Sequence, residues 1–321
     1  MEPNASVDLE QGTVRYRDSG GNGEAIVFVH GLLVSGSLWR KVVPALGAEY
    51  RCIAPDWPLG SHEPAMKPDA DMSPRGVAHL IADFLAALDL EGVTIVANDT
   101  GGAIAQLLAS ERPERVGRLV LTPCDCYENF LPPAFKPLQW IARVPGALTL
   151  LMQATRLASV RRSQLAFGML TRDAIADEVT AAWVRPFLRD RGVRRDTVRL
   201  LRGIDARDTL AAAETLRSFH APTLLAWSPK DRFFKIEFAE RLAASIPNAR
   251  LERIEGSYTF VPEDEPGRLA ALIDEFIRSS PLAAPVSVNG ERPPESAPAG
   301  DAVDLPAGAR QATEALPTAS G

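Results

Sequence analysis

Val93-Thr-Ile-Val-Ala-Asn-Asp-Thr-Gly-Gly-Ala-Ile-Ala-Gln106 is the stretch that decides the fold. Its opening run, residues 93–96, is typical of a buried parallel strand. From Ala103 onward the residues are good helix formers, so a helix follows the strand directly. Small residues stand two positions before and two positions after Asp99, as a strained strand-to-helix elbow requires. The stretch therefore predicts that Asp99 projects from the carboxyl edge of a sheet.

A carboxylate at the centre of an elbow has two interpretations. As a nucleophile, Asp99 would attack an electrophilic carbon and form an enzyme ester. Backbone N–H groups and the helix N-terminus would then point at the same place. Alternatively, the carboxylate would only cap the helix that follows. The small neighbours and the sheet-edge position favour an active-site location, but they leave open whether Asp99 reacts.

The rest of the chain alternates between strands and helices on both sides of the elbow. We expect an edge hairpin over 6–18 and strands at 25–29, 52–55, 119–122, 222–227 and 250–254. The helices that we expect cover 38–46, 75–88, 237–246 and 267–278. Strands that alternate with helices form a mainly parallel sheet with right-handed crossovers, so the predicted fold class is α/β.

The alternation stops after the strand at 119–122. From 124 to 214 helical patterns dominate, such as 148–157 and 175–188, and they predict an inserted helical cap rich in arginine. The predicted domains are a first core part at 1–123, the cap at 124–214, a second core part at 215–280 and a tail at 281–321. The tail is rich in Pro and Ala and has few large apolar residues, so we expect it to be disordered.

Composition argues against several classes of function. The 321 residues are 46% hydrophobic, which is enough for one large globular domain or two smaller ones. A net charge of −6 argues against a general nucleic-acid or membrane partner. Because the chain has three cysteines without zinc-type spacing, no signal peptide and no long apolar run, we expect a cytoplasmic protein without metal or cofactor. The oligomeric state is left open.

The order of a strand, a His30-Gly31 turn, an elbow and a cap makes residues 6–280 resemble the α/β-hydrolase family. With Asp99 at the nucleophile position and two glycines after Thr100, the chain is similar to the group that contains haloalkane dehalogenases and epoxide hydrolases. The resemblance implies an α/β-hydrolase fold with a pocket between cap and sheet and Asp99 at its base. It also implies a small, largely apolar substrate.

The resemblance assigns roles to residues around the nucleophile. The backbone N–H groups of Leu32 and Thr100 would form the oxyanion hole. Asp231, which follows the next-to-last core strand, would orient a catalytic histidine. Asp125 lies near the alternative position that some members use for this acid.

The chain departs from the family after its last strand. Members usually carry Gly-x-x-His-Phe there, whereas this chain has Gly256-Ser-Tyr-Thr-Phe260, so Thr259 stands at the histidine position. A threonine hydroxyl cannot accept a proton from water at neutral pH, whereas an imidazole can. An ester on Asp99 would therefore form and then hydrolyse slowly. A hydrogen bond from Thr259 to Asp231 is a possible substitute that would keep the loop geometry without the chemistry.

Other residues are candidates for the missing base and for the substrate pocket. His62 would supply the base if its loop folds over the elbow; otherwise it is a solvated loop residue. We expect His30 to shape the oxyanion turn beside the substrate rather than to move protons. The rings of Trp57 and Trp140 would line the pocket, although aromatic residues at such positions usually belong to the core.

Two absences limit the substrate. Haloalkane dehalogenases resemble one another in a Trp directly after the nucleophile, whose N–H helps to hold the leaving halide, and this chain has Thr100 there. Epoxide hydrolases use two cap tyrosines, and here only Tyr127 falls at the cap. The leading hypothesis is a hydrolase-like enzyme that uses Asp99 on a small apolar molecule. The alternative is a non-hydrolytic binding protein or a proton-transfer enzyme, because Thr259 replaces the histidine.

Overall fold

An eight-stranded sheet forms the centre of the computed structural model, which describes residues 2–164 and 166–282. Its strands are β1 (Ala5–Leu9), β2 (Gly12–Asp18), β3 (Ala25–Val29), β4 (Arg51–Pro55), β5 (Val93–Asp99), β6 (Val116–Cys124), β7 (Thr223–Trp227) and β8 (Ala249–Arg253). Their order across the sheet is β1-β2-β4-β3-β5-β6-β7-β8. Only the pairs β1–β2 and β2–β4 among these are antiparallel, which confirms the mainly parallel sheet. Apart from 281 and 282, the predicted tail lies outside the described residues.

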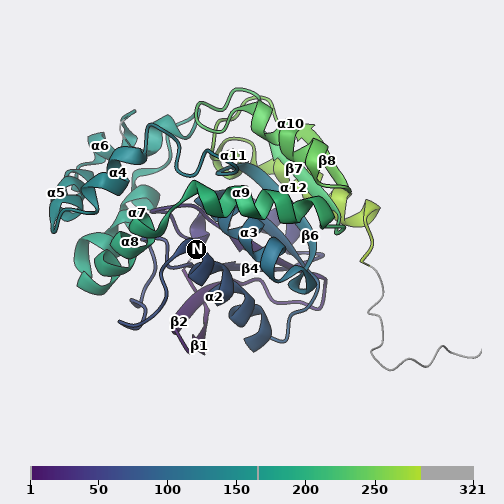
Figure 1. Cartoon of the computed structure of the whole chain (residues 1–321), viewed down its shortest axis with the longest axis horizontal. Helices are drawn as coiled ribbons and strands as arrows, with labels where there is room; N and C mark the ends of the chain where they lie inside the picture. The colour runs from purple at the N-terminus through teal and green to yellow at the C-terminus, as the bar shows by residue number, and fades with distance from the viewer. Residues whose placement is uncertain (1, 165, 283–321) are drawn as a thin grey trace, which may run out of the picture. The chain divides into compact units, whose positions relative to one another are not determined.

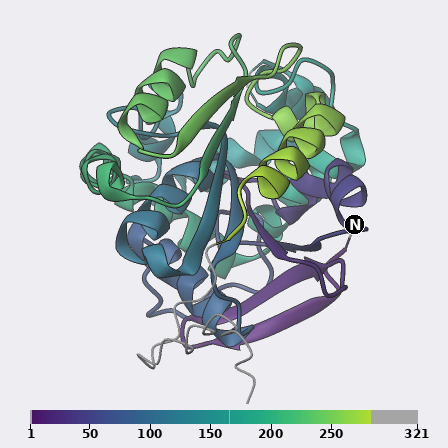
Figure 2. The same cartoon turned by 90° about the vertical axis from the view of Figure 1, so that its right-hand side faces the viewer.

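The sheet twists from one edge to the other. Figure 2 shows this twist, with the purple hairpin of β1 and β2 at one edge and the green β8 at the opposite edge. The central position belongs to β5, which pairs with β3 on one side and β6 on the other. Asp99, the last residue of β5, therefore lies at the carboxyl edge in the middle of the parallel part of the sheet.

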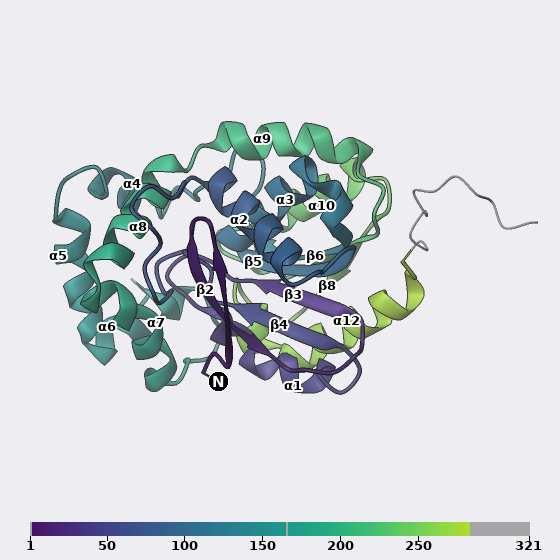
Figure 3. The same ribbon diagram turned by 90° about the horizontal axis from the view of Figure 1, so that it is seen from below.

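Helices cover both faces of the sheet (Figures 1 and 3). One face packs against α2 (Pro74–Ala87), α3 (Thr100–Glu111), α9 (Ala206–Thr215) and α10 (Ile236–Ser245). The other face packs against the 3-10 helix η1 (Gly36–Lys41) and against α1 (Val43–Leu46), α11 (Val261–Asp264) and α12 (Pro266–Ser279). Strand side chains alternate between the two cores, since Val27 and Val29 join the first and Ile26 and Phe28 join the second. None of the described helices has the length and hydrophobicity needed to cross a bilayer.

Helices are the named elements between β6 and β7 in the described part of the chain. They are α4 (Lys136–Ile141), α5 (Ala147–Gln153), η3 (Ala154–Arg156), α6 (Ala158–Arg162), η4 (Phe167–Met169), α7 (Asp177–Arg189), α8 (Arg191–Gly203), α9 and η5 (Leu216–Ser218). We call residues 125–222 the helical insertion; the sequence predicts a cap over most of it. Buried side chains of α7, such as Trp183 and Phe187, join the second core, whereas α9 packs on the first.

Two predicted helices are divided in the structure. In place of one helix at 38–46, η1 ends at Lys41 and α1 begins at Val43, because Pro44 has no backbone N–H and fits only the first turn of a helix. In place of 148–157, α5 ends at Gln153 and the short η3 follows. The helix predicted at 75–88 is confirmed as α2, whose N-cap Ser73 accepts a hydrogen bond from the backbone N–H of Gly76.

The three cysteines are buried and form no disulfide. Burial raises the pKa of the Cys52 thiol to about 12. Burial also raises the pKa of the Cys124 and Cys126 thiols well above the ordinary value. The thiolate is the reactive form of cysteine, so these residues are unreactive at neutral pH.

Candidate active site

The elbow begins where β5 ends. Asp99 has φ 56° and ψ −135°, a conformation that residues with side chains rarely adopt, and α3 starts at the next residue. The glycines that follow permit close packing, since a Cβ on Gly101 would lie 2.3 Å from the carbonyl oxygen of His30. A Cβ on Gly102 would lie 2.2 Å from the Cβ of Cys124. The structure thus contains the strained elbow that the sequence predicts.

The Asp99 carboxylate lies in a cradle of backbone groups. Its side chain does not make the usual capping hydrogen bonds to α3. Instead, the carboxylate accepts hydrogen bonds from the backbone N–H groups of Leu32 and Thr100. Gly31 leaves room for the carboxylate, because a Cβ there would lie 2.0 Å from Oδ2 of Asp99. Asp99 and Leu32 remain partly exposed, whereas Thr100 is buried.

The protonation of Asp99 is set mainly by burial. Burial raises the pKa of Asp99 from 3.8 to about 7, and the negative charge of Asp231 acts in the same direction. The hydrogen bonds from Leu32 and Thr100 lower the pKa and oppose this shift. Near neutral pH the carboxyl group is therefore divided between its neutral and its anionic form.

This shift predicts that stability depends on pH. The folded-state pKa of Asp99 lies above the unfolded value. The contribution of Asp99 to the free energy of unfolding is therefore highest at low pH, and it decreases as the pH rises from about 4 to about 7. Asp99→Asn cannot ionise, so we expect it to exceed the wild type in stability at pH 8 by a few kcal/mol and by much less at pH 4.5. Urea unfolding at both pH values measures this, with Asp69→Asn at an exposed position as control. A difference that does not change with pH would contradict the assignment.

Asp231 and Thr259 form the second part of the site. Asp231 lies in the turn after β7, where its Oδ1 accepts the backbone N–H groups of Phe233 at 2.7 Å and Phe234 at 2.6 Å. Oδ2 accepts the Thr259 hydroxyl at 2.7 Å, which is the hydrogen bond expected as a substitute for the histidine. Burial raises the pKa of Asp231, although these hydrogen bonds lower it. Thr259 thus occupies the partner position of the acid without offering a base.

Asp125 contacts Thr100, the residue after Asp99. It follows β6, and its Oδ2 accepts a hydrogen bond from the Thr100 hydroxyl at 3.3 Å. Its Oδ1 is buried and has no hydrogen-bond partner among the described residues. Burial and the charge of Asp99 raise the pKa of Asp125 well above the ordinary value. Its side-chain hydrogen bond goes to Thr100 and not to a histidine.

His62 is held by the helical insertion. Its Nε2 lies 3.3 Å from Oδ2 of Asp196, which belongs to α8. The same Asp196 oxygen accepts the backbone N–H of Met66 at 2.9 Å. Both His62 and Asp196 are buried. His62 is therefore not the solvated loop residue of the second interpretation, and the hydrogen bond that it makes goes to Asp196.

His30 fixes the turn at Gly31, which faces Asp99. Its Nε2 accepts the backbone N–H of Trp57 at 2.8 Å, so Nδ1 carries the proton and donates to the carbonyl oxygen of Gly31 at 2.9 Å. Burial lowers the pKa of His30 to about 4. The neutral ring fixes Gly31, which in turn faces Asp99.

The two tryptophans predicted to line the substrate pocket lie in the core and on the surface instead. Trp57 is fully buried, donates its Nε1–H to the carbonyl oxygen of Phe28 at 2.9 Å and packs against Phe84 with ring centroids 5.1 Å apart. Trp140 lies on α4 and is 62% exposed. We therefore correct this prediction: Trp57 belongs to the core, as apolar rings usually do, and Trp140 to the surface.

Asn98 is a site residue that the sequence reasoning missed. Its Nδ2 lies 2.8 Å from Oγ1 of Thr122, 3.1 Å from the carbonyl oxygen of Pro123 and 2.8 Å from that of Thr259. The side chain thus joins the elbow strand to β6 and to the Thr259 loop. A signal was available, because a fully buried amide inside an apolar strand needs partners.

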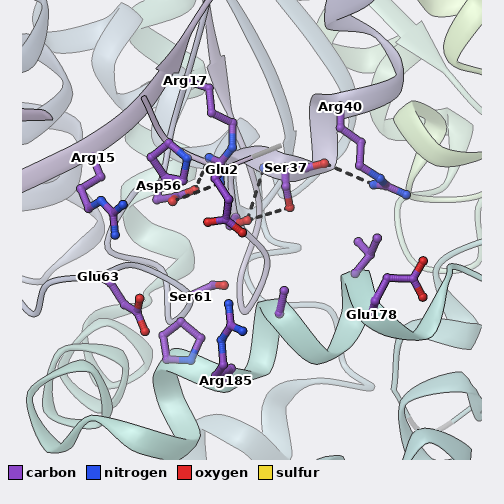
Figure 4. A pocket seen from close by; sticks show the side chains of 15 residues that line it. Glu2, Arg15, Arg17, Ser37, Arg40, Asp56, Ser61, Glu63, Glu178 and Arg185 are labelled. Atoms are coloured by element: carbon purple, nitrogen blue, oxygen red, sulfur yellow. Dashed lines mark hydrogen bonds and ion pairs between the residues drawn. The ribbon is translucent and has the colours of Figure 1, made fainter. Parts of the chain in front are cut away.

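A polar cavity of about 320 Å³ lies beside the insertion (Figure 4). Residues from β2, from η1, from the segment after β4 and from α7 line it, and Arg17 is paired there with Asp56 at 2.6 Å. Asp99 does not line this cavity or the two other cavities described for residues 2–164 and 166–282. The predicted pocket with Asp99 at its base is not one of these three.

Comparison with known proteins gives a family match and several relatives. Residues 24–266 match the family described as "alpha/beta hydrolase fold". The chain is 34% identical over 130 residues to a haloalkane dehalogenase of Mesorhizobium japonicum, which covers 39% of this chain and 41% of that protein. It is 28% identical over 294 residues to a cis-3-alkyl-4-alkyloxetan-2-one decarboxylase of Xanthomonas campestris, which covers 86% of this chain and 96% of that protein.

Solved structures agree with these sequence matches. The structure of a putative ancestral haloalkane dehalogenase is similar with a TM-score of 0.71 and 25% identity. This similarity covers 86% of this chain and 98% of that one. Both the sheet and the helices around it therefore have counterparts in a protein of known structure.

Proposed function

The chain belongs to the alpha/beta hydrolase fold family, and from this premise we propose that the Asp99 carboxylate is its nucleophile. The position of the oxyanion donors carries the proposal. The N–H groups of Leu32 and Thr100 hydrogen-bond to the Asp99 carboxylate itself. In a serine hydrolase the corresponding donors receive an oxygen of the substrate. Here they hold an oxygen of the nucleophile, which fits chemistry at the Asp99 carboxyl carbon.

This arrangement suits attack on an alkyl carbon. The free oxygen of Asp99 forms a C–O bond to that carbon, and the leaving group departs with the electrons of the broken bond. The product of this step is a neutral ester. When water then attacks the ester carbonyl, the negative charge develops on the oxygen held by Leu32 and Thr100 and is stabilised there.

The second step lacks an efficient base. Water must lose a proton as it attacks the ester. The Thr259 hydroxyl cannot accept this proton, and it is a hydrogen-bond donor to Asp231. His62 would be a substitute, but its hydrogen bond among the described residues goes to Asp196 of the insertion and not to Asp99, Asp231 or Thr259. We therefore propose that alkylation of Asp99 is faster than hydrolysis of the ester.

The proposed substrate is a small, largely apolar electrophile that reaches Asp99 beneath the helical insertion, which acts as a cap. The insertion contacts the Thr259 loop, since the backbone N–H of Phe260 donates to the carbonyl oxygen of Leu170 at 2.9 Å. The names of two relatives indicate haloalkanes or strained oxetanone rings. Because the Thr100 hydroxyl is bonded to Asp125 and cannot hold a halide, we favour a strained ring, whose opening is driven by release of strain.

The missing base favours a second candidate, a reaction that needs no water. If Asp99 attacks the alkyl carbon of an oxetan-2-one, the ring C–O bond breaks and a carboxylate forms on the substrate. Loss of CO₂ then supplies the electrons for a C=C bond and expels the Asp99 carboxylate. The enzyme is regenerated without a proton acceptor, so Thr259 at the histidine position would be no obstacle. The similarity to the oxetanone decarboxylase supports this candidate.

Intact-mass spectrometry tests the proposal. We expect a wild-type protein to form an adduct with at least one of 1-bromohexane, 1,2-epoxyhexane and a cis-dialkyl oxetan-2-one. The bromoalkane adds one hexyl group and releases bromide, whereas each ring-opened molecule adds its whole mass. Asp99→Asn should gain none, because an amide is a poor nucleophile. Asp69→Asn, at an exposed carboxylate, should behave as the wild type.

The outcomes separate the candidates. A stable adduct supports the alkylation with slow hydrolysis, and release of CO₂ and alkene from the oxetanone without a stable adduct supports the water-free reaction. Exchange of deuterium into a carbon acid without any adduct would instead assign Asp99 to proton transfer, which its pKa of about 7 also suits. If the full panel gives no adduct and no product, the assignment of Asp99 as the nucleophile is contradicted.

A further inference from the structure

One end of the helical insertion exposes large apolar side chains. Of the seven exposed large hydrophobic residues among those described, five fall between 140 and 157: Trp140, Val144, Leu150, Leu151 and Leu157. Their exposed fractions run from 45% to 76%. They belong to α4, α5 and the connections up to α6, which lie together at one end of the insertion (Figures 1 and 3). We call residues 136–162 the apolar end.

The region that contains the apolar end has a charge opposite to that of the whole chain. Residues 129–172 contain six basic residues and no acidic residue, whereas the net charge of the protein is −6. Arg161 of this set is buried and paired with Asp177. Four others are exposed within the apolar end: Lys136, Arg143, Arg156 and Arg162.

A further cation joins them from α8. The guanidinium of Arg202 donates to the carbonyl oxygens of Ala142 at 2.9 Å and Arg143 at 3.3 Å, which places its charge beside the end of α4. The apolar end is thus a set of protruding apolar side chains surrounded by cations.

We propose that the apolar end docks on an anionic lipid surface. Apolar side chains that protrude singly from short helices can enter the boundary between headgroups and acyl chains. Lys and Arg beside them can keep their charges at the level of the phosphates while their aliphatic stems lie against the apolar region. Trp140 has the amphipathic ring that is typical of membrane interfaces. The three unpaired cysteines fit a cytoplasmic location, where anionic lipids face the protein.

Charge argues against a second copy of this chain as the occupant. A twofold interface pairs a surface with itself, so the cations of one apolar end would face those of the other. The net charge of −6 led us to expect no membrane partner, but that sum averages over the chain. A local excess of cations is sufficient for attraction to an anionic surface, because the attraction acts over about one Debye length.

Tryptophan fluorescence gives a direct test. The chain has five tryptophans, and four of them, Trp39, Trp57, Trp183 and Trp227, are fully buried. A shift of emission to shorter wavelength on addition of vesicles therefore reports Trp140. We expect this shift with vesicles of phosphatidylcholine and phosphatidylglycerol (3:1) at low salt, a weaker one at high salt, and little with phosphatidylcholine alone. Trp140→Phe should abolish the shift but not sedimentation with the vesicles.

Surface variants with matched controls complete the test. Removing Arg143, Arg156 and Arg162 together, each as Arg→Gln, should weaken vesicle binding by about fivefold per cation, on the order of a hundredfold in all. Leu150→Ser with Leu151→Ser should also weaken binding to the anionic vesicles. The controls are Leu210→Ser and Arg217→Gln, which change an exposed leucine and an exposed arginine outside the apolar end.

Four results with vesicles or with the protein alone, and a fifth with polyglutamate, would overturn the proposal. The first four are no binding to either vesicle, equal binding to both compositions, equal weakening in the controls, and self-association in the absence of lipid that the variants abolish. The fourth would assign the apolar end to a second copy. Binding to polyglutamate as tight as to the anionic vesicles would assign it to an acidic protein instead.

Discussion

Thr259→His is expected to accelerate breakdown of the Asp99 ester by about 10²–10⁴-fold, which is the usual contribution of a positioned general base. The Thr259 hydroxyl lies 2.7 Å from Oδ2 of Asp231, so an imidazole on the same Cα has an acid ready to orient it. The imidazole can take the proton of the attacking water, which the hydroxyl cannot. The measurement is the decay of a preformed adduct in the intact-mass spectrum, followed over time after excess electrophile is removed.

The rate of adduct formation is the internal check of this variant. Thr259 is fully buried, and histidine is larger, so an unchanged alkylation rate shows that the site still folds correctly. Thr259→Ser keeps a hydroxyl for Asp231 and should keep the slow decay. Adding Asp231→Asn to Thr259→His should remove much of the gain. If the adduct decays at the wild-type rate in Thr259→His although alkylation is normal, Thr259 is not the reason for slow hydrolysis.

Gly31→Ala is expected to slow alkylation of Asp99 by about 10²–10³-fold, the range found when an oxyanion donor is removed. A Cβ at this position would lie 2.0 Å from Oδ2 of Asp99 and 2.6 Å from its Cβ and Cγ, so the carboxylate must move out of its cradle. The backbone beneath cannot yield easily, because His30 holds the carbonyl of Gly31 at 2.9 Å. Single-turnover mass measurements give the rate.

The matched control for this variant is Gly267→Ala. A Cβ on Gly267, in the first turn of α12, would meet no atom within 4 Å, so this substitution should leave alkylation unchanged. Circular dichroism of both variants shows whether the fold is retained. A Gly31→Ala protein that is folded and reacts at the wild-type rate would contradict the cradle as the place of the reacting carboxylate.

Local sequence predicted the centre of the site well. The elbow depends on residues within a few positions of Asp99, so the small residues around it were sufficient to place the strand end and the start of α3. The hydrogen bond from Thr259 to Asp231 joins residues 28 positions apart, and it was expected because the family resemblance places an acid and its histidine partner at these two positions. Family resemblance supplied Leu32 and Thr100.

Partners that are distant in sequence could not be predicted in this way. His62 bonds to Asp196, which is 134 positions away on α8, and no local pattern connects the two. Trp57 and Trp140 have the same side chain but opposite surroundings, because Trp57 packs against Phe84 of α2 in the core whereas Trp140 lies on the surface of α4. The division of the helix expected at 38–46 is different, because Pro44 in the sequence was sufficient to predict it.

The burial of Cys52, Cys124 and Cys126 has a practical consequence for selectivity. Thiols normally compete with carboxylates for electrophiles and win, since a thiolate is the stronger nucleophile. In this protein burial holds the pKa of all three thiols high, so few thiolates exist at neutral pH. Covalent labelling should therefore stop at one label per molecule, attached through oxygen, without replacement of any cysteine. Such a label marks a single known atom of the chain.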